Sequence, residues 1–162
     1  MRTGSLLFLL MISLAADCQN IFPAKFQGCV TDRFELESKI YAASDKDSLL
    51  LTIVSNLEKD IANELRGEVR IQVIIDTSGN PCCLSAENNL NSSLGRLHLD
   101  EIINTKTKWS KPVRTFDAEM IKVSATILLR FDKKRITFKR LGFNGKTHNW
   151  QELESCFIVK SQ

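Results

Sequence analysis

Five cysteines carry the most varied chemistry in this 162-residue sequence: Cys18, Cys29, Cys82, Cys83 and Cys156. Thiols form disulfides in oxidising compartments, bind metals or act as nucleophiles. Cys82 and Cys83 are neighbours, so in a strand their side chains point to opposite faces. One of them can therefore pair with Cys29 or Cys156 while the other packs in the core. A Cys29–Cys156 bond is the alternative, and the odd count leaves a thiol over unless Cys18 is lipidated.

A more specific interpretation is a metal site built from Cys82, Cys83 and His98. Alternatively, Cys82 or Cys83 is a thiol nucleophile and His98 is its base. The spacing matches no standard zinc pattern, and a lone histidine such as His98 or His148 needs a placed partner to act. The sequence has no glycine-rich phosphate loop and no strong pair of catalytic acids. We therefore predict that the protein is not an enzyme and uses no cofactor and no metal. A thiol or metal protein that uses Cys82 and Cys83 is the remaining alternative.

The N-terminus predicts export. Residues 6–16 form a largely apolar run of 11 residues after a positive start, and Ser13-Leu14-Ala15 is a small-x-small cleavage site, with Ala16 as an alternative last residue. A membrane-spanning helix needs ~20 apolar residues, so this run is too short to cross a bilayer. We expect a signal peptide at residues 1–16, a periplasmic or secreted product, and no transmembrane helix after cleavage. Lipid anchoring at Cys18 is disfavoured, because Asp17 stands where lipoprotein signals have a small residue.

Composition indicates one ordinary globular domain. The sequence is 43% hydrophobic and 25% charged, and about 145 residues follow the predicted signal peptide. The formal net charge of +3 is too small for a typical nucleic-acid binder, which usually carries a concentrated basic patch. We interpret the basic residues between 133 and 140 as a solvated strand end and predict no nucleic-acid partner.

Hydrophobic periodicity predicts a long helix in the first half of the chain. It begins at Asp45 or Asp47 and ends at Gly67. Its apolar face consists of Leu50, Ile53, Val54, Leu57, Ile61 and Leu65. A short helix around residues 34–41 is also expected in the lead-in.

The following stretch predicts a sheet. Residues 68–76 alternate between apolar and polar, as in a strand with one buried face, and turn residues lead into a second strand at about 82–87. A short helix at about 94–108 comes next. A long alternating strand at 119–131 completes the unit.

Four pieces of this unit are similar to a known family. They are Gly67-Glu68-Val69 at the first strand, the acidic turn at 76–80, the helix start Leu99-Asp100-Glu101, and Trp109-Ser110-Lys111-Pro112 before the last strand. In this order they resemble the TonB C-terminal domain family, known from periplasmic energy transducers of Gram-negative bacteria. The resemblance covers about 65 residues. Trp109 is expected to be a core residue that seals a helix onto the sheet.

The resemblance implies an α+β fold, with a small antiparallel sheet of about three strands and two helices on one face. It also implies that the last strand is an exposed edge that accepts an extended peptide by strand addition. The predicted binding residues are alternate positions of this strand: Lys122, Ser124, Thr126, Leu128 and Arg130. The family's tyrosine-proline pair is replaced by Asn56-Leu57, and no anchor or proline-rich linker is expected, so we do not expect a full energy transducer.

The tail, residues 132–162, extends beyond the usual end of the family. Residues 135–143 have strand character, Asn144-Gly145 is a turn signal, and residues 150–154 are expected to form a helical turn. The simplest interpretation is a C-terminal strand or hairpin that occupies or flanks the predicted peptide-binding edge.

These predictions divide the chain into a signal peptide (1–16), a lead-in segment (17–44), a TonB C-terminal-like domain (45–131) and a C-terminal extension (132–162). The predicted function is an exported binding or accessory module of the cell envelope, which recognises a cell-envelope or outer-membrane protein by strand addition. The alternative is a purely structural domain whose edge is covered by its own tail.

Overall fold

A computed structural model describes residues 19–36, 40–41, 46–114, 120–133, 135–143 and 150–158. The predicted signal peptide, Cys18, His148 and the Asn144-Gly145 turn lie outside the described residues. Among the described helices, none combines the length and the apolar character that a membrane crossing requires.

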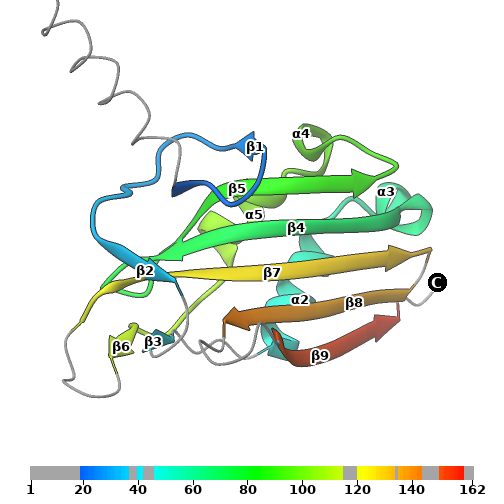
Figure 1. Cartoon of the computed structure of the whole chain (residues 1–162). Coiled ribbons are helices and arrows are strands. Elements are labelled where there is room, and N and C mark those ends of the chain that lie inside the picture. The colour runs from blue at the N-terminus through cyan, green and yellow to red at the C-terminus, as the bar shows by residue number, and fades with distance from the viewer. Residues whose placement is uncertain are drawn as a thin grey trace, which may run out of the picture.

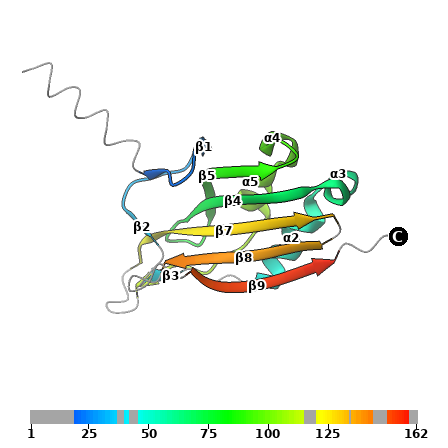
Figure 2. The same cartoon turned by 45° about the vertical axis from the view of Figure 1, so that its right-hand side comes forward.

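The described chain forms a curled sheet with short helices on one face (Figures 1 and 2). The strands are β1 (Ala24–Lys25), β2 (Phe34–Leu36), β3 (Ile40–Tyr41), β4 (Arg66–Ile75), β5 (Pro81–Leu90), β6 (Val113–Arg114), β7 (Lys122–Asp132), β8 (Arg135–Phe143) and β9 (Trp150–Ile158). The helices are α2 (Lys46–Asn56), α3 (Lys59–Glu64), α4 (Leu94–Leu97) and α5 (Leu99–Lys106).

The main sheet has seven strands. Six follow the order β1-β5-β4-β7-β8-β9, and all neighbours in this row are antiparallel. The remaining strand, β2, runs parallel to the start of β7, which makes the sheet mixed. A separate two-stranded sheet joins β3 to β6.

The predicted fold class is therefore wrong in scale and in the type of sheet. We expected about three antiparallel strands with two helices, and the structure has a seven-stranded mixed sheet with four short helices among its described residues. The expected core residues Val73 and Ile127 are both fully buried on the helix-covered face. The difference arises from the lead-in and the tail, which add strands on both sides of the predicted unit.

The predicted long helix is two helices. All six residues of its apolar face are buried, but the chain leaves helical geometry at Leu57 and Glu58, between α2 and α3. The Asn56 side chain donates a hydrogen bond to the Thr52 carbonyl oxygen at 2.8 Å, next to the end of α2. The predicted short helix at 34–41 is also wrong, because this segment contains β2 and β3.

The prediction that Gly67 ends a helix is wrong. Helix α3 ends at Glu64, Leu65 is extended, and Gly67 lies within β4 with a φ of +107°. A Cβ at this position would lie 2.1 Å from the Asn89 carbonyl oxygen of β5. Glycine is therefore required here by its positive φ and by the close approach of the neighbouring strand.

The second predicted helix is divided at His98, which has a φ of +47° between α4 and α5. Trp109 follows α5 and is 8% exposed, which confirms its expected place in the core. Its ring nitrogen Nε1 donates to Thr107 Oγ1 at 3.1 Å, so the buried polar edge of the ring has a partner.

The tail is a β-hairpin, which is one of the two arrangements predicted for it, a strand or a hairpin. Strand β8 pairs with β7 from Arg135 to Leu141, and β9 pairs with β8 along its whole length. The expected helical turn at 150–154 is wrong, because these residues belong to β9. The predicted pairing of the tail with the long strand that precedes it is confirmed, because β8 pairs with β7.

Candidate functional site

The predicted binding strand, β7, lies inside the sheet and is not a free edge. Strand β4 pairs with it from Val123 to Asp132 on one side. On the other side, β2 pairs with residues 122–124 and β8 with residues 126–132. Strand addition along β7 would therefore require one of these segments to leave.

The side chains of the five predicted binding residues lie on the face of the sheet away from the helices, which we call the second face. Lys122 binds the carboxylate of Asp32 and donates to the Val30 carbonyl oxygen at 3.3 Å. The hydrogen bond and the charge of Lys122 lower the pKa of Asp32 below its ordinary value. Thr126 and Leu128 are buried. The structure brings the five residues together on one strand, and it gives three of them intramolecular polar partners (Lys122, Ser124 and Arg130).

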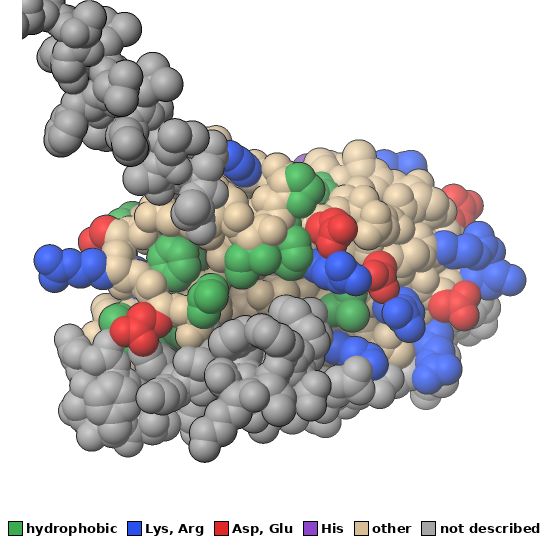
Figure 3. Space-filling view, in the orientation of Figure 1, with side chains coloured by type: hydrophobic (Ala, Val, Ile, Leu, Met, Phe, Trp, Pro, Cys, Tyr) green, Lys and Arg blue, Asp and Glu red, His purple; other side chains and the backbone are tan. Residues whose placement is uncertain are grey.

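Charged side chains form a ladder at one end of the second face. Arg70 on β4 contacts Glu87 of β5 at 2.9 Å and Glu68 at 3.0 Å, and Glu68 also contacts Arg130 of β7 at 3.1 Å. Figure 3 shows acidic and basic side chains next to one another on this face, beside a group of apolar side chains. Because each charge has a neighbour of opposite sign, the ladder presents no large field of one sign to a ligand.

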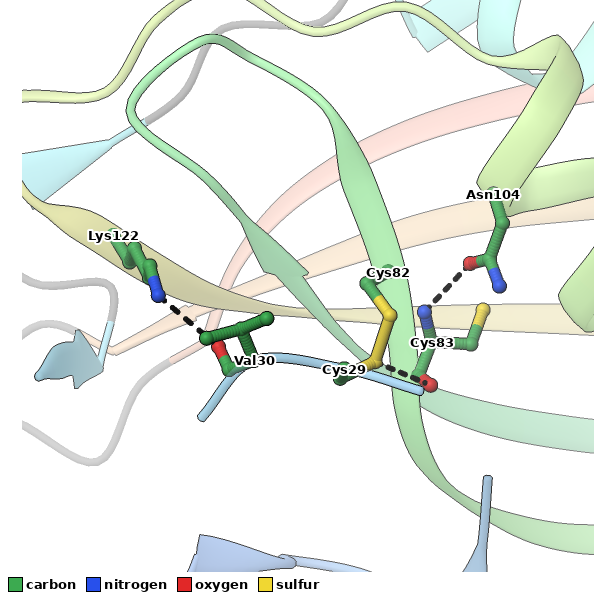
Figure 4. Close-up of a disulfide and its surroundings, with 6 residues drawn as sticks. All are labelled: Cys29, Val30, Cys82, Cys83, Asn104 and Lys122. Carbon is green, nitrogen blue, oxygen red and sulfur yellow. Dashed lines mark hydrogen bonds between the residues drawn. A yellow bond between two sulfur atoms is a disulfide. The ribbon is translucent and has the colours of Figure 1, made fainter. Parts of the chain in front are cut away.

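A disulfide joins Cys29 to Cys82, with the Cα atoms 5.7 Å apart (Figure 4). It fastens the N-terminal segment to β5. Cys83 points away from this bond toward the helices, where it is a buried free thiol, and Asn104 of α5 accepts a 2.7 Å hydrogen bond from its backbone N–H. The expectation that the two adjacent cysteines face opposite sides, with one bonded and one packed, is confirmed. The open choice between Cys29 and Cys156 as partner is resolved in favour of Cys29.

The chemistry of Cys83 is that of a core residue. Burial, helped by the charge of Asp100, raises the pKa of its thiol well above the ordinary value. The reactive thiolate is therefore disfavoured. His98 lies in a largely exposed position, 3.7 Å from Glu101, and the described residues contain no cluster of three or more His, Cys, Asp or Glu side chains that could hold a metal ion.

Gln72 is a functional candidate that the sequence reasoning missed. Its side chain on the second face is 0% exposed, between Ser85 of β5 and Ser124 of β7. The carboxamide nitrogen donates to Ser124 Oγ at 3.0 Å, and the carboxamide oxygen accepts from Ser85 Oγ at 2.6 Å. Two further hydrogen bonds join it to the N-terminal segment, with the Gln19 carbonyl oxygen at 3.1 Å and the Ile21 N–H at 2.9 Å. The alternation of β4 predicts a solvent-facing residue here, so no signal in the sequence indicated its burial.

The outer sides of the sheet differ in how much they are covered. On β5, strand β1 pairs with Ser85 and Ala86, and the Phe26 N–H donates to the Leu84 carbonyl oxygen at 3.0 Å. On the opposite side, β9 ends the row, and among the described residues it pairs only with β8. The main chain of the nine-residue strand β9 is therefore the longest one-sided edge in the described part of the sheet.

No protein-family model, no curated protein and no solved structure matches this chain.

Proposed function

We propose that this protein is an exported protein-binding or accessory module of the cell envelope, which recognises an extended segment of a partner protein by strand addition at β9. The observation that carries the proposal is the one-sided pairing of β9 over nine residues. Strand addition uses main-chain N–H and C=O groups, which an edge strand offers in a continuous row.

Two short segments of the chain already bind the sheet in this way. Strand β1 adds two residues to β5, and strand β2 adds three residues to β7. The sheet therefore accepts extended segments that contribute only a few main-chain hydrogen bonds. This supports strand addition as the mode of recognition and moves the proposed site from β7 to β9.

Export is part of the proposal and has two supports. The N-terminal sequence has the pattern of a signal peptide. The Cys29–Cys82 disulfide is compatible with an oxidising compartment, in which such bonds persist. We retain the resemblance to the TonB C-terminal domain family within this proposal, because it supplied the strand-addition mode and the expectation of a cell-envelope or outer-membrane partner.

The second candidate function is purely structural. It is favoured by the pairing of β8 along β7, because the chain's own tail then fills the edge that the resemblance assigns to a peptide. The two candidates differ in what β9 does: in the first it binds a partner, and in the second it only closes the sheet.

Neighbouring proline substitutions on β9 test the proposal. Successive N–H groups in a strand point to opposite sides, so one of Leu153→Pro and Glu154→Pro removes an outward N–H and the other removes a bond to β8. We expect one variant to keep the thermal stability of the parent and to lose the proteins that the full chain captures from a cell-envelope extract. Glycine-to-alanine replacement at Gly95, which has open space around it, is the matched control and should retain them.

The two functions give different outcomes. Equal capture by the stable proline variant would show that β9 is not the binding edge. If the folded full chain captures no protein that the denatured chain does not also capture, the structural function is favoured instead.

A further inference from the structure

The N-terminal segment crosses the second face of the sheet and is bound there through its main chain. Gln72 accepts a hydrogen bond from the Ile21 N–H and donates one to the Gln19 carbonyl oxygen. Ser85 Oγ accepts another from the Phe22 N–H at 3.2 Å. These three contacts use no side chain of the bound segment.

The contacted groups belong to a bent stretch of main chain, because residues 21–23 form bends. In an extended chain, successive N–H groups point to opposite sides, so the bend is what brings the N–H groups of both Ile21 and Phe22 to the sheet. Gln72 reaches the C=O of Gln19 and the N–H of Ile21 with one carboxamide, whose donors and acceptor lie in a single rigid plane. The Ile21 side chain itself is 49% exposed.

The carboxamide is held in place by the strands on both sides of β4. Ser124 Oγ accepts from its nitrogen, and Ser85 Oγ donates to its oxygen, so its two donors and both acceptor positions are used. Because all four positions are filled, the amide has one orientation. When the segment is displaced, one donor and one acceptor position of the carboxamide become open to a replacement ligand with the same groups.

We propose that Gln72, Ser85 and Ser124 form a recognition site for the main chain of peptides that bend across the second face, and that residues 19–22 occupy it as an intramolecular ligand. The site takes a peptide whose first residue offers a C=O and whose third and fourth residues offer N–H groups. Its side-chain selectivity is low, but proline is excluded at the third and fourth positions. The site lies on β4, β5 and β7, so it is independent of the proposed binding edge on β9.

The experiment empties the site and offers it the same ligand in solution. The protein is the full chain after the predicted signal peptide, with its disulfide intact, and it carries Ile21→Pro, which removes the N–H that Gln72 accepts. The probe is a fluorescent peptide with the sequence of residues 17–24 and serine in place of Cys18. We expect fluorescence anisotropy to show binding to the Ile21→Pro chain.

Matched controls separate main-chain recognition from general stickiness. Ile21→Ala keeps the N–H, so this chain should stay occupied and bind the probe no better than the parent. The probe methylated on the nitrogen of Ile21 should bind the Ile21→Pro chain roughly tenfold more weakly or worse, since one hydrogen bond is lost. Adding Gln72→Ala to the Ile21→Pro chain should have a similar effect.

Several results would overturn the proposal. They are a folded Ile21→Pro chain that binds no probe, binding that N-methylation leaves unchanged, and binding that persists with Gln72→Ala. If Ile21→Pro does not fold, a chain without residues 19–22 replaces it. If that chain also fails to fold, the segment is an obligatory part of the core and the proposal is wrong. None of these results bears on partner capture through β9.

Discussion

The guanidinium carbon of Arg140 lies 5.0 Å from the centre of the Trp109 ring, and both side chains are buried. Arg140 belongs to β8, whereas Trp109 follows α5. A cation over an aromatic face is a favourable arrangement, more so when it is shielded from water. The tail is thus joined to the rest of the fold by a side-chain contact as well as by the pairing of β8 with β7.

Removal of the tail after Lys134 should expose Trp109. The truncated chain keeps Trp109 as its single tryptophan, so the full chain with Trp150→Phe is the matched control. We expect the emission maximum of the truncated chain to move to longer wavelength and its free energy of unfolding to fall, because β8 covers part of the core. Identical emission spectra in the two chains would show that β8 does not shield the ring.

Glycine at position 67 should be essential for stability. Gly67→Ala places a Cβ 2.1 Å from the Asn89 carbonyl oxygen and also requires a positive φ. We expect the free energy of unfolding to fall by roughly 2 kcal/mol or more, as measured by urea titration. Gly95→Ala, with nothing within 4 Å of its new Cβ, should change it by no more than about 1 kcal/mol. Similar values for the two variants would contradict the close approach of β5.

The Cys29–Cys82 bond should stabilise the fold by constraining the unfolded chain. It links residues separated by 53 positions, and loops of this size correspond to about 4 kcal/mol in the chain-entropy description. The double variant Cys29→Ser/Cys82→Ser should unfold at lower guanidinium concentration than the oxidised parent. A reductant should lower the midpoint of guanidinium unfolding of the parent and leave that of the double variant unchanged. An equal effect on the two midpoints would be evidence against this bond.

Cys83 should be inert in the folded protein. Its burial raises the pKa of the thiol, and alkylating reagents react with the thiolate. We expect iodoacetamide at about pH 8.5 to leave Cys83 unmodified in the native chain and to modify it in denaturant, with peptide mass spectrometry locating the label. Equal rates in both conditions would place the thiol at the surface.

Asp76 should make the β4–β5 turn sensitive to acid. Burial opposes the charged form, but hydrogen bonds from Asn80, Ser78 and Gly79 outweigh it and lower the pKa of Asp76 below its ordinary value. A lowered folded pKa gives stability that is present above the unfolded pKa of ~3.9 and is lost as pH falls through the folded value.

The size of this effect is small, because Asp76 is largely solvated and its interactions are screened; we expect less than about 1 kcal/mol. Urea titrations between about pH 2 and pH 7 should show that the free energy of unfolding of the parent exceeds that of Asp76→Asn at neutral pH. This difference should disappear in the acid range. A constant difference across this range would mean that the carboxylate does not titrate with a lowered pKa.

The local sequence pattern was sufficient to predict those features of the fold that depend on residues close together in the chain. The alternation of β4 and β7 identified the faces that carry Val73 and Ile127, because strand side chains repeat every two residues. The spacing of the apolar face identified six buried residues of α2, α3 and their connections, and it missed Leu49 and Ala62. Adjacency alone placed Cys82 and Cys83 on opposite faces. Trp109 could be assigned to the core from its place between a helix and a proline.

The sequence by itself therefore determined most of the apolar side chains that face the core within each element, and tertiary structure decided how many elements pair and which polar groups meet. Strand pairing joins residues far apart in the chain, such as Thr137 of β8 with Cys156 of β9, and no local period encodes such a choice. The same holds for Gln72. Its position on β4 predicts solvent, and only the passage of residues 19–22 over the second face turns an ordinary polar side chain into a buried one that binds a peptide main chain.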